Sequence, residues 1–145
     1  MRFLILAVAL MWTFPEEKVP DYSYESQYGI LEDYFDQEEI DLICRVIDSE
    51  ASICPPESKM HVCSVILNRY FDGWGGDKGI RGVCRKGQFS LRREDYSEEA
   101  YNALNAVWQE GPTNDGYYFC RKKVSVFYGG SWLFADGYHN FYGRH

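Results

Sequence analysis

The sequence predicts an α+β fold that is mainly helical, with a small antiparallel sheet in the C-terminal half. Up to about residue 108, apolar residues recur at the spacing of helices. After Gly111-Pro112 the apolar period shortens to that of strands. Helices followed by a block of strands are typical of α+β chains, and a length of 145 residues corresponds to about one domain.

The first 35 residues differ in character from the rest and divide into two segments. Residues 1–14 are apolar after Met1-Arg2, with the length of a secretory signal or an anchor and too few residues for a spanning helix. Residues 15–35 are acidic, aromatic and proline-containing, which predicts a linker with poor local order. We therefore expect the folded domain to comprise residues 36–145.

Charge is distributed unevenly along the chain. The net charge is −7, but residues 16–41 carry −9 and residues 42–145 carry +1. An acidic run of this kind is usually solvated. Because the predicted domain lacks the basic footprint of a nucleic-acid-binding protein, we expect no nucleic-acid partner.

The five cysteines include no C-x-x-C pair, which argues against a zinc site and against a thioredoxin-type redox site. We therefore expect no metal and no cofactor. Cys44 and Cys63 fall at apolar positions of predicted helices, and we interpret them as small core residues. If the chain is exported, one or two disulfide bonds can form, and the sequence does not determine their pairing.

The first predicted helix runs from about Gln37 to Glu50. Asp36 and Glu39 have the spacing of a capping box, and an apolar stripe follows them. Glu50 lies at the end of this stripe, where residues 54–56 turn the chain back. Burial of an unpaired carboxyl is costly, so Glu50 is either solvated at the helix end or held in a cleft for proton transfer.

A second helix is predicted from Pro56, which suits a first helical turn, to about Tyr70. The simplest interpretation of Arg69 is that it caps the last carbonyls of this helix. The glycine-rich residues 73–79 predict a loop that is too irregular for a phosphate cradle. Residues 80–96 are expected to form short turns.

A third helix is predicted to begin after the N-cap residue Ser97 and to stop at Gly111-Pro112. The residues beyond it alternate like strands. The expected strands are Tyr117–Cys120 and Val124–Tyr128, joined by a turn at residues 121–123, with Phe141–Tyr142 as a third.

Four short motifs, in this order, resemble the signature of the SleB-type cell wall hydrolases, a family of spore-cortex-lytic enzymes and phage-encoded relatives. The first is Glu50-Ala51, followed by an apolar helix that ends in Val65-Ile66-Leu67-Asn68-Arg69. The later three are Gly87-Gln88-Phe89-Ser90, Gly116-Tyr117-Tyr118-Phe119 and His139-x-Phe141-Tyr142. The resemblance covers about residues 38–142.

The resemblance implies a lysozyme-like fold and cleavage of peptidoglycan glycan strands, commonly by lytic transglycosylase chemistry. It implies that Glu50 is the catalytic acid. A carboxyl desolvated at the end of a buried helix favours its protonated form, as a proton donor requires. Spacing assigns no second carboxylate to a glycosidase pair. By the same resemblance, the glycan cleft is lined by Gln88, Phe89, Ser90, Tyr118, His139 and Tyr142.

Three departures from the family pattern leave the substrate contacts open. Ser52 stands where the family often has arginine, and Ser58-Lys59 stands where it usually has Gly-Gln. The asparagine that follows the family's aromatic strand is replaced near Arg121. The alternative function is a catalytically silent wall-binding or virion structural module on the same scaffold. Both functions imply a secreted, periplasmic or wall-associated protein, with residues 1–14 as the part that would contact a membrane or a virion.

Overall fold

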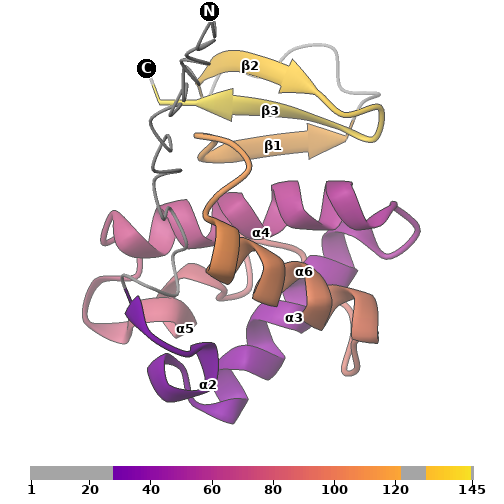
Figure 1. Cartoon of the computed structure of the whole chain (residues 1–145). Coiled ribbons are helices and arrows are strands. Elements are labelled where there is room, and N and C mark those ends of the chain that lie inside the picture. Colours follow the sequence, from indigo (N-terminus) through magenta and orange to yellow (C-terminus); the bar gives the residue numbers. More distant parts are fainter. Residues whose placement is uncertain (1–27, 122–129, 145) are drawn as a thin grey trace, which may run out of the picture.

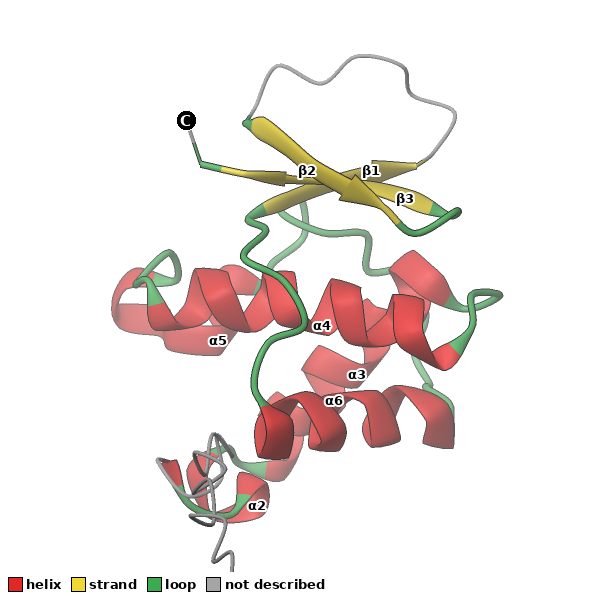
Figure 2. Cartoon of the chain, turned by 45° about the horizontal axis from the view of Figure 1, so that its top comes forward, coloured by secondary structure: helices red, strands yellow, loops and turns green. Residues whose placement is uncertain are grey.

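The computed structural model describes residues 28–121 and 130–144, and it shows a group of helices covered on one side by a small sheet. In Figures 1 and 2 the strands lie beside α4, and α3 and α6 lie beyond α4. The elements are α2 (Leu31–Tyr34), α3 (Gln37–Ala51), α4 (Pro56–Phe71), η1 (Gly76–Lys78), α5 (Gly79–Val83), α6 (Glu98–Glu110), β1 (Tyr118–Arg121), β2 (Ser131–Ala135) and β3 (His139–Gly143). Among the described residues, no helix has the length and apolar character needed to cross a membrane.

Helix α3 begins at the predicted capping box. The Asp36 carboxylate accepts a hydrogen bond from the Glu39 N–H at 2.8 Å, and the Asp36 N–H donates to the Glu39 carboxylate at 3.0 Å. These bonds satisfy amide groups that a helix start otherwise leaves unpaired. Ile43 and Ile47 on the apolar stripe are fully buried. The first predicted helix is therefore confirmed.

Helix α4 runs through the middle of the core and packs against both α3 and α6. Its start at Pro56 confirms the second predicted helix. Helix α6 follows the N-cap residue Ser97, whose hydroxyl accepts from the Ala100 N–H at 3.2 Å. Trp108 on α6 is fully buried, and its indole N–H donates to the Gly29 carbonyl at 2.9 Å. The third predicted helix is therefore also confirmed.

Four of the five cysteines, Cys44, Cys54, Cys63 and Cys84, are buried in this structure, and Cys120 is partly exposed. All five lie in the described part of the chain and all are free thiols. Burial raises the pKa of Cys44 and that of Cys84 to about 12, and it raises the pKa of Cys63 as well. Buried thiols that stay protonated are poor nucleophiles and poor metal ligands, which agrees with their interpretation as core residues.

The expected linker at residues 15–35 needs correction at its C-terminal end. Leu31 and Phe35 are 1% and 3% exposed and belong to the hydrophobic core. The Phe35 ring lies 5.4 Å from that of Trp108. Glu32 and Asp33, whose charges favoured a linker, are exposed on the opposite side of this short helix. Residues 1–14 and 15–27 lie outside the described residues.

The glycine-rich segment is more regular than predicted. Residues 76–83 form η1 and α5, where a loop and short turns were expected. A Cβ atom on Gly75 would lie 1.8 Å from the Gly79 carbonyl oxygen, and one on Gly82 would lie 2.3 Å from that of Gly75. The glycines therefore permit close backbone packing, and this allows Ile80 and Val83 to reach the core.

The sheet is antiparallel, with strand order β1-β3-β2. Strand β3 confirms the strand expected at Phe141–Tyr142, while the whole of the expected strand at residues 124–128 lies outside the described residues. Strand β2 was not predicted because a bulge between Trp132 and Phe134 interrupts its alternation. Arg121, expected in a turn, ends β1. The predicted fold class, mainly helical α+β with a small antiparallel sheet, is confirmed.

Candidate active site

Glu50 lies in the last turn of α3 and is half-buried. Its Oε1 atom accepts a hydrogen bond of 2.5 Å from the backbone N–H of Ser90. Ser90 ends the Gly87-Gln88-Phe89-Ser90 turn, so two motifs that are 40 residues apart in sequence meet at this carboxyl. Because a backbone donor fixes one oxygen, the other is the one available to a ligand.

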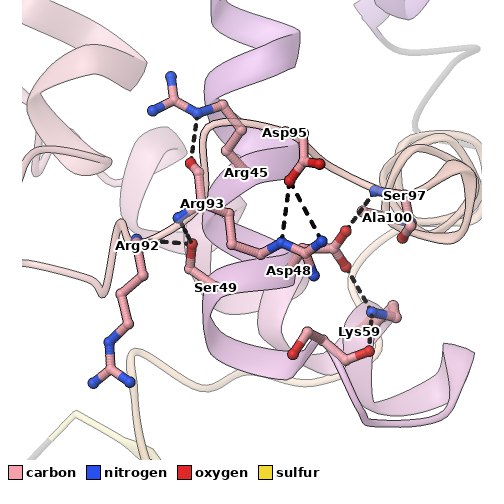
Figure 3. A network of polar contacts seen from close by, with 10 residues as sticks. Arg45, Asp48, Ser49, Lys59, Arg92, Arg93, Asp95, Ser97 and Ala100 are labelled. Atoms are coloured by element: carbon pink, nitrogen blue, oxygen red, sulfur yellow. Dashed lines mark hydrogen bonds and ion pairs between the residues drawn. The ribbon is translucent and has the colours of Figure 1, made fainter.

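A buried ion pair supports the helix end that carries Glu50 (Figure 3). The Lys59 ammonium on α4 lies 2.6 Å from Asp48 Oδ1 and donates to the Ala51 and Ser52 carbonyls at 2.9 and 3.3 Å. Asp48 Oδ2 accepts from the Ser97 N–H at 2.6 Å. Burial acts to raise the pKa of Asp48, but its hydrogen bonds with Lys59 and Ser97 prevail and the pKa is lowered.

A loop after Ser90 is fastened to the same helix. The Ser49 hydroxyl accepts from the backbone N–H groups of Arg92 and Arg93 at 3.1 and 3.2 Å. Arg45 Nε donates to the Arg93 carbonyl at 2.9 Å (Figure 3). Two side chains of α3 therefore fix the backbone of residues 92 and 93 to the helix that carries Glu50.

Glu50 opens into a cleft of about 560 Å³. Its lining consists of residues 48–50 and 52–54 at the end of α3, Arg92 and Arg93, Arg121 at the end of β1, and residues 137–139 before and in β3. Asp48 and Glu50 are the acidic residues in this described lining, and Asp48 is occupied by Lys59 and Ser97. Glu50 is therefore the one carboxyl there that is open to a ligand.

His139 lines the cleft opposite the helix end and is 3% exposed. Its backbone N–H donates to Asp136 Oδ1 at 2.8 Å, and its Nδ1 atom has no hydrogen-bond partner among the described residues. Burial lowers the pKa of His139, while the Asp136 charge and the carbonyl and carboxylate of Glu50 partly oppose this. The ring is therefore neutral at pH 7, and its Nδ1 atom is buried.

The other expected site residues are distributed around the cleft. Ser90 contacts Glu50 directly, whereas Gln88 is exposed in the adjoining turn. Phe89 is 7% exposed and stacks on Phe119 with ring centres 5.9 Å apart. Tyr118 and Tyr142 occupy paired positions of β1 and β3 and do not line the cleft. The structure thus brings Glu50, Ser90 and His139 together.

Arg69 does not cap the last carbonyls of α4. Its Nε atom donates to the Tyr117 carbonyl at 2.7 Å. Its guanidinium lies 4.5 Å from the centre of the Phe89 ring and 4.9 Å from that of Trp74. Arg69 therefore links α4 to β1 and supports the turn that holds Ser90, a role that helix-end position alone cannot reveal.

Sequence reasoning missed Ser49, Arg92 and Arg121 in this site. Arg92 follows the Gly-Gln-Phe-Ser turn by two residues, and that proximity was a usable signal. For Arg121 the departure from the family pattern was the available signal, but its place in the cleft depends on its pairing with His139 across the sheet. Within residues 28–121 and 130–144, no group of three or more histidine, cysteine or acidic side chains has a geometry that could hold a metal ion.

Comparison with known proteins identifies similar folds. The catalytic domain of the Bacillus cereus SleB protein superposes with a TM-score of 0.63 at 20% sequence identity, covering 74% of this chain and 91% of that chain. The catalytic domain of the germination-specific lytic transglycosylase SleB from Bacillus anthracis gives a TM-score of 0.59 at 21% identity, covering 74% and 96%. No family model and no curated protein matches the chain. The chain therefore has the fold of these catalytic domains, and the lysozyme-like fold expected from its motifs is confirmed.

Proposed function

We propose that this chain cleaves the glycan strands of peptidoglycan as a lytic transglycosylase, with Glu50 as its single general acid and base. The observation that carries the proposal is the position of Glu50, which opens into a cleft whose other lining carboxylate, Asp48, is paired with Lys59. A fold shared with the catalytic domain of a germination-specific lytic transglycosylase supports the same activity. The activity places the protein outside the cell or at the wall.

The reaction requires one carboxyl in two protonation states. Protonated Glu50 donates its proton to the glycosidic oxygen, and the bond from that oxygen to the anomeric carbon breaks. The sugar's own 6-hydroxyl then attacks the anomeric carbon, and the Glu50 carboxylate takes the hydroxyl proton. Glu50 returns to its starting state, the product is a 1,6-anhydro sugar, and no water is consumed.

Neighbouring groups orient Glu50 and the sugar in this proposal. The Ser90 N–H holds Oε1, which leaves Oε2 to carry the transferred proton. The neutral His139 ring lines the cleft and is 3% exposed, so it is suited to shape the sugar site beside Glu50. Tyr138 is 44% exposed at the rim, where its ring can pack on a sugar face.

The other residues expected to contact the glycan differ in how well their exposure suits that role. Gln88 is exposed beside the cleft, and its amide can donate to and accept from a sugar, so we propose that it binds the glycan. Tyr118 is half-buried, and its ring centre lies 5.4 Å from the Arg69 guanidinium; we propose that it extends the glycan-binding surface. Phe89 and Tyr142 are 7% and 6% exposed, which favours packing over substrate contact.

A zymogram on purified peptidoglycan tests the proposed activity. The wild-type chain should clear the substrate, and Glu50→Gln should fold normally and lose clearing by several orders of magnitude. Absence of clearing by a folded wild-type chain would favour the alternative, a catalytically silent wall-binding or virion module on this scaffold.

Mass spectrometry of the products tests the chemistry. Anhydro-muropeptides are expected if Glu50 acts alone. Products with reducing ends would show that a water molecule is the acceptor, and the chain would then be a muramidase-type hydrolase of the same strands.

A further inference from the structure

The cleft contains two arginine side chains that have no ionic partner among the described residues. Asp48 is paired with Lys59, and Arg93 lies 3.4 Å from Asp95. Arg92 and Arg121 also line the cleft, and neither forms a salt bridge with any residue that the structure describes. Beside Glu50, the cleft therefore presents two guanidinium groups that are free to bind an anion.

Arg92 occupies a fixed position on one wall of the cleft. Its backbone N–H is bonded to the hydroxyl of Ser49, the residue immediately before Glu50. In Figure 3 its guanidinium points away from Asp48 and Asp95, and thus away from the nearby paired charges. The backbone is anchored while the charged end remains exposed.

Arg121 occupies the sheet side of the cleft. It is paired with His139 in the register of β1 and β3. Side chains of directly paired residues on antiparallel strands lie on the same face of a sheet, and both residues line the cleft. Arg121 and Arg92 thus approach the space in front of Glu50 from two different elements.

We propose that Arg92 and Arg121 form a subsite for the stem-peptide carboxylates of peptidoglycan, which makes peptide-bearing strands the substrate class of this cleft. The proposal rests on the proposed function. The muramic acid at the cleaved bond carries a lactyl group, and the attached peptide has free carboxylates along it and at its end. Guanidinium groups bind carboxylates through paired hydrogen bonds. A strand whose muramic acid is a lactam, or a polymer of N-acetylglucosamine alone, carries no stem peptide there and offers no such carboxylate.

The test compares one peptidoglycan preparation in two forms, native and with its carboxylates converted to amides by carbodiimide and ammonia. This treatment leaves the glycan and the peptide in place and removes only the negative charge. We expect the wild-type chain to have a KM about tenfold lower on the native form, with about threefold from each guanidinium, the scale of solvent-exposed ion pairs. Raising the salt to about 1 M should reduce this ratio, because the Debye length falls to about 3 Å.

The double variant Arg92→Gln/Arg121→Gln should bring the KM ratio of amidated to native substrate to about one. Lys78→Gln is the matched control, since it removes one exposed positive charge outside the cleft lining and should keep the wild-type ratio. Equal KM values of the wild-type chain on both substrates would overturn the proposal. The same ratio in the double variant and the wild type would also overturn it.

Binding separates this proposal from the proposed function. Sedimentation with native and amidated peptidoglycan, using Glu50→Gln with and without the two arginine substitutions, measures the subsite without turnover. If the wild-type chain cleaves neither substrate but binding still depends on the carboxylates and both arginines, the function is wrong and the subsite stands. If it cleaves both equally and binds both equally, the function stands and the subsite is wrong.

Discussion

The ammonium group of Lys59 on α4 lies 2.6 Å from the carboxylate of Asp48 on α3, and both side chains are 1% exposed. The same ammonium also binds the carbonyls of Ala51 and Ser52, which flank the end of α3. One buried cation thus joins the two central helices and satisfies the helix end next to Glu50. Two buried charges that satisfy each other in this way are costly to separate.

Replacement of Lys59 by methionine should destabilise the domain strongly. The substitution leaves the Asp48 carboxylate buried without its cation, which costs about 3–5 kcal/mol in comparable cases. Urea unfolding followed by circular dichroism measures the loss. Lys78→Met is the control, because that side chain is exposed and its loss should cost less than about 0.5 kcal/mol. A loss below about 1 kcal/mol for Lys59→Met would show that water solvates Asp48.

Asp48→Asn combined with Lys59→Met should recover part of that stability. The double variant removes both charges, so no carboxylate remains buried without a partner. Partial recovery relative to Lys59→Met alone is the sign of direct coupling between contacting residues. Strict additivity of the two single effects would contradict it.

His139 should make the domain less stable in mild acid. Burial lowers the pKa of this ring in the folded chain below its ordinary value of 6.5. The unfolded chain then binds the proton more tightly than the folded chain. The contribution of His139 to the free energy of unfolding is therefore fully present above pH 6.5 and declines as the pH falls below it. The free energy of unfolding can be measured in urea at pH 7.5 and 5.5, about one unit either side of that value. Between these two pH values it should fall less in His139→Gln than in the wild-type chain. An equal fall in the free energy of unfolding in both chains would show that a group other than His139 causes the pH dependence.

Gln88→Ala separates a glycan contact from a turn contact. Gln88 is exposed, so the melting temperature should change little. If its amide positions the glycan, kcat/KM should fall by about tenfold or more. Arg85→Ala, an exposed change in the same turn, should leave kcat/KM near that of the wild type. A lower melting temperature with normal activity per folded molecule would identify Gln88 as a turn residue only.

The N-terminal boundary of the domain should lie before Leu31. A chain that starts at Tyr34 lacks Leu31, which is 1% exposed in the core, and we expect it to be destabilised. Leu31→Ala in the full chain should cost about 2–5 kcal/mol, as buried leucine truncations do. A chain that starts at Tyr28 keeps this side chain and should match the full chain in urea unfolding. Equal stability of the chains starting at Tyr28 and Tyr34 would support the domain start at residue 36 that the sequence predicts.

The sequence by itself determined the features that depend on residues close together in the chain. The capping pair Asp36 and Glu39 and the N-cap Ser97 act over three residues, so spacing alone locates the starts of α3 and α6. The apolar stripe of α3 likewise predicted its buried face and the position of Glu50 at its end. The order of the four motifs carried the resemblance to the SleB-type family, and that resemblance implied the lysozyme-like fold.

Only the tertiary structure decided which distant residues share the cleft. Asp48 meets Ser97 across 49 positions, and Arg121 meets His139 through strand register. Leu31, in a segment dominated by its charges, is buried in the hydrophobic core. Such contacts follow from how helices and strands pack, and residue type and spacing do not encode that packing locally. Among the described residues, the open carboxyl of Glu50 and the two arginines of the cleft without a salt bridge are consequences of that packing.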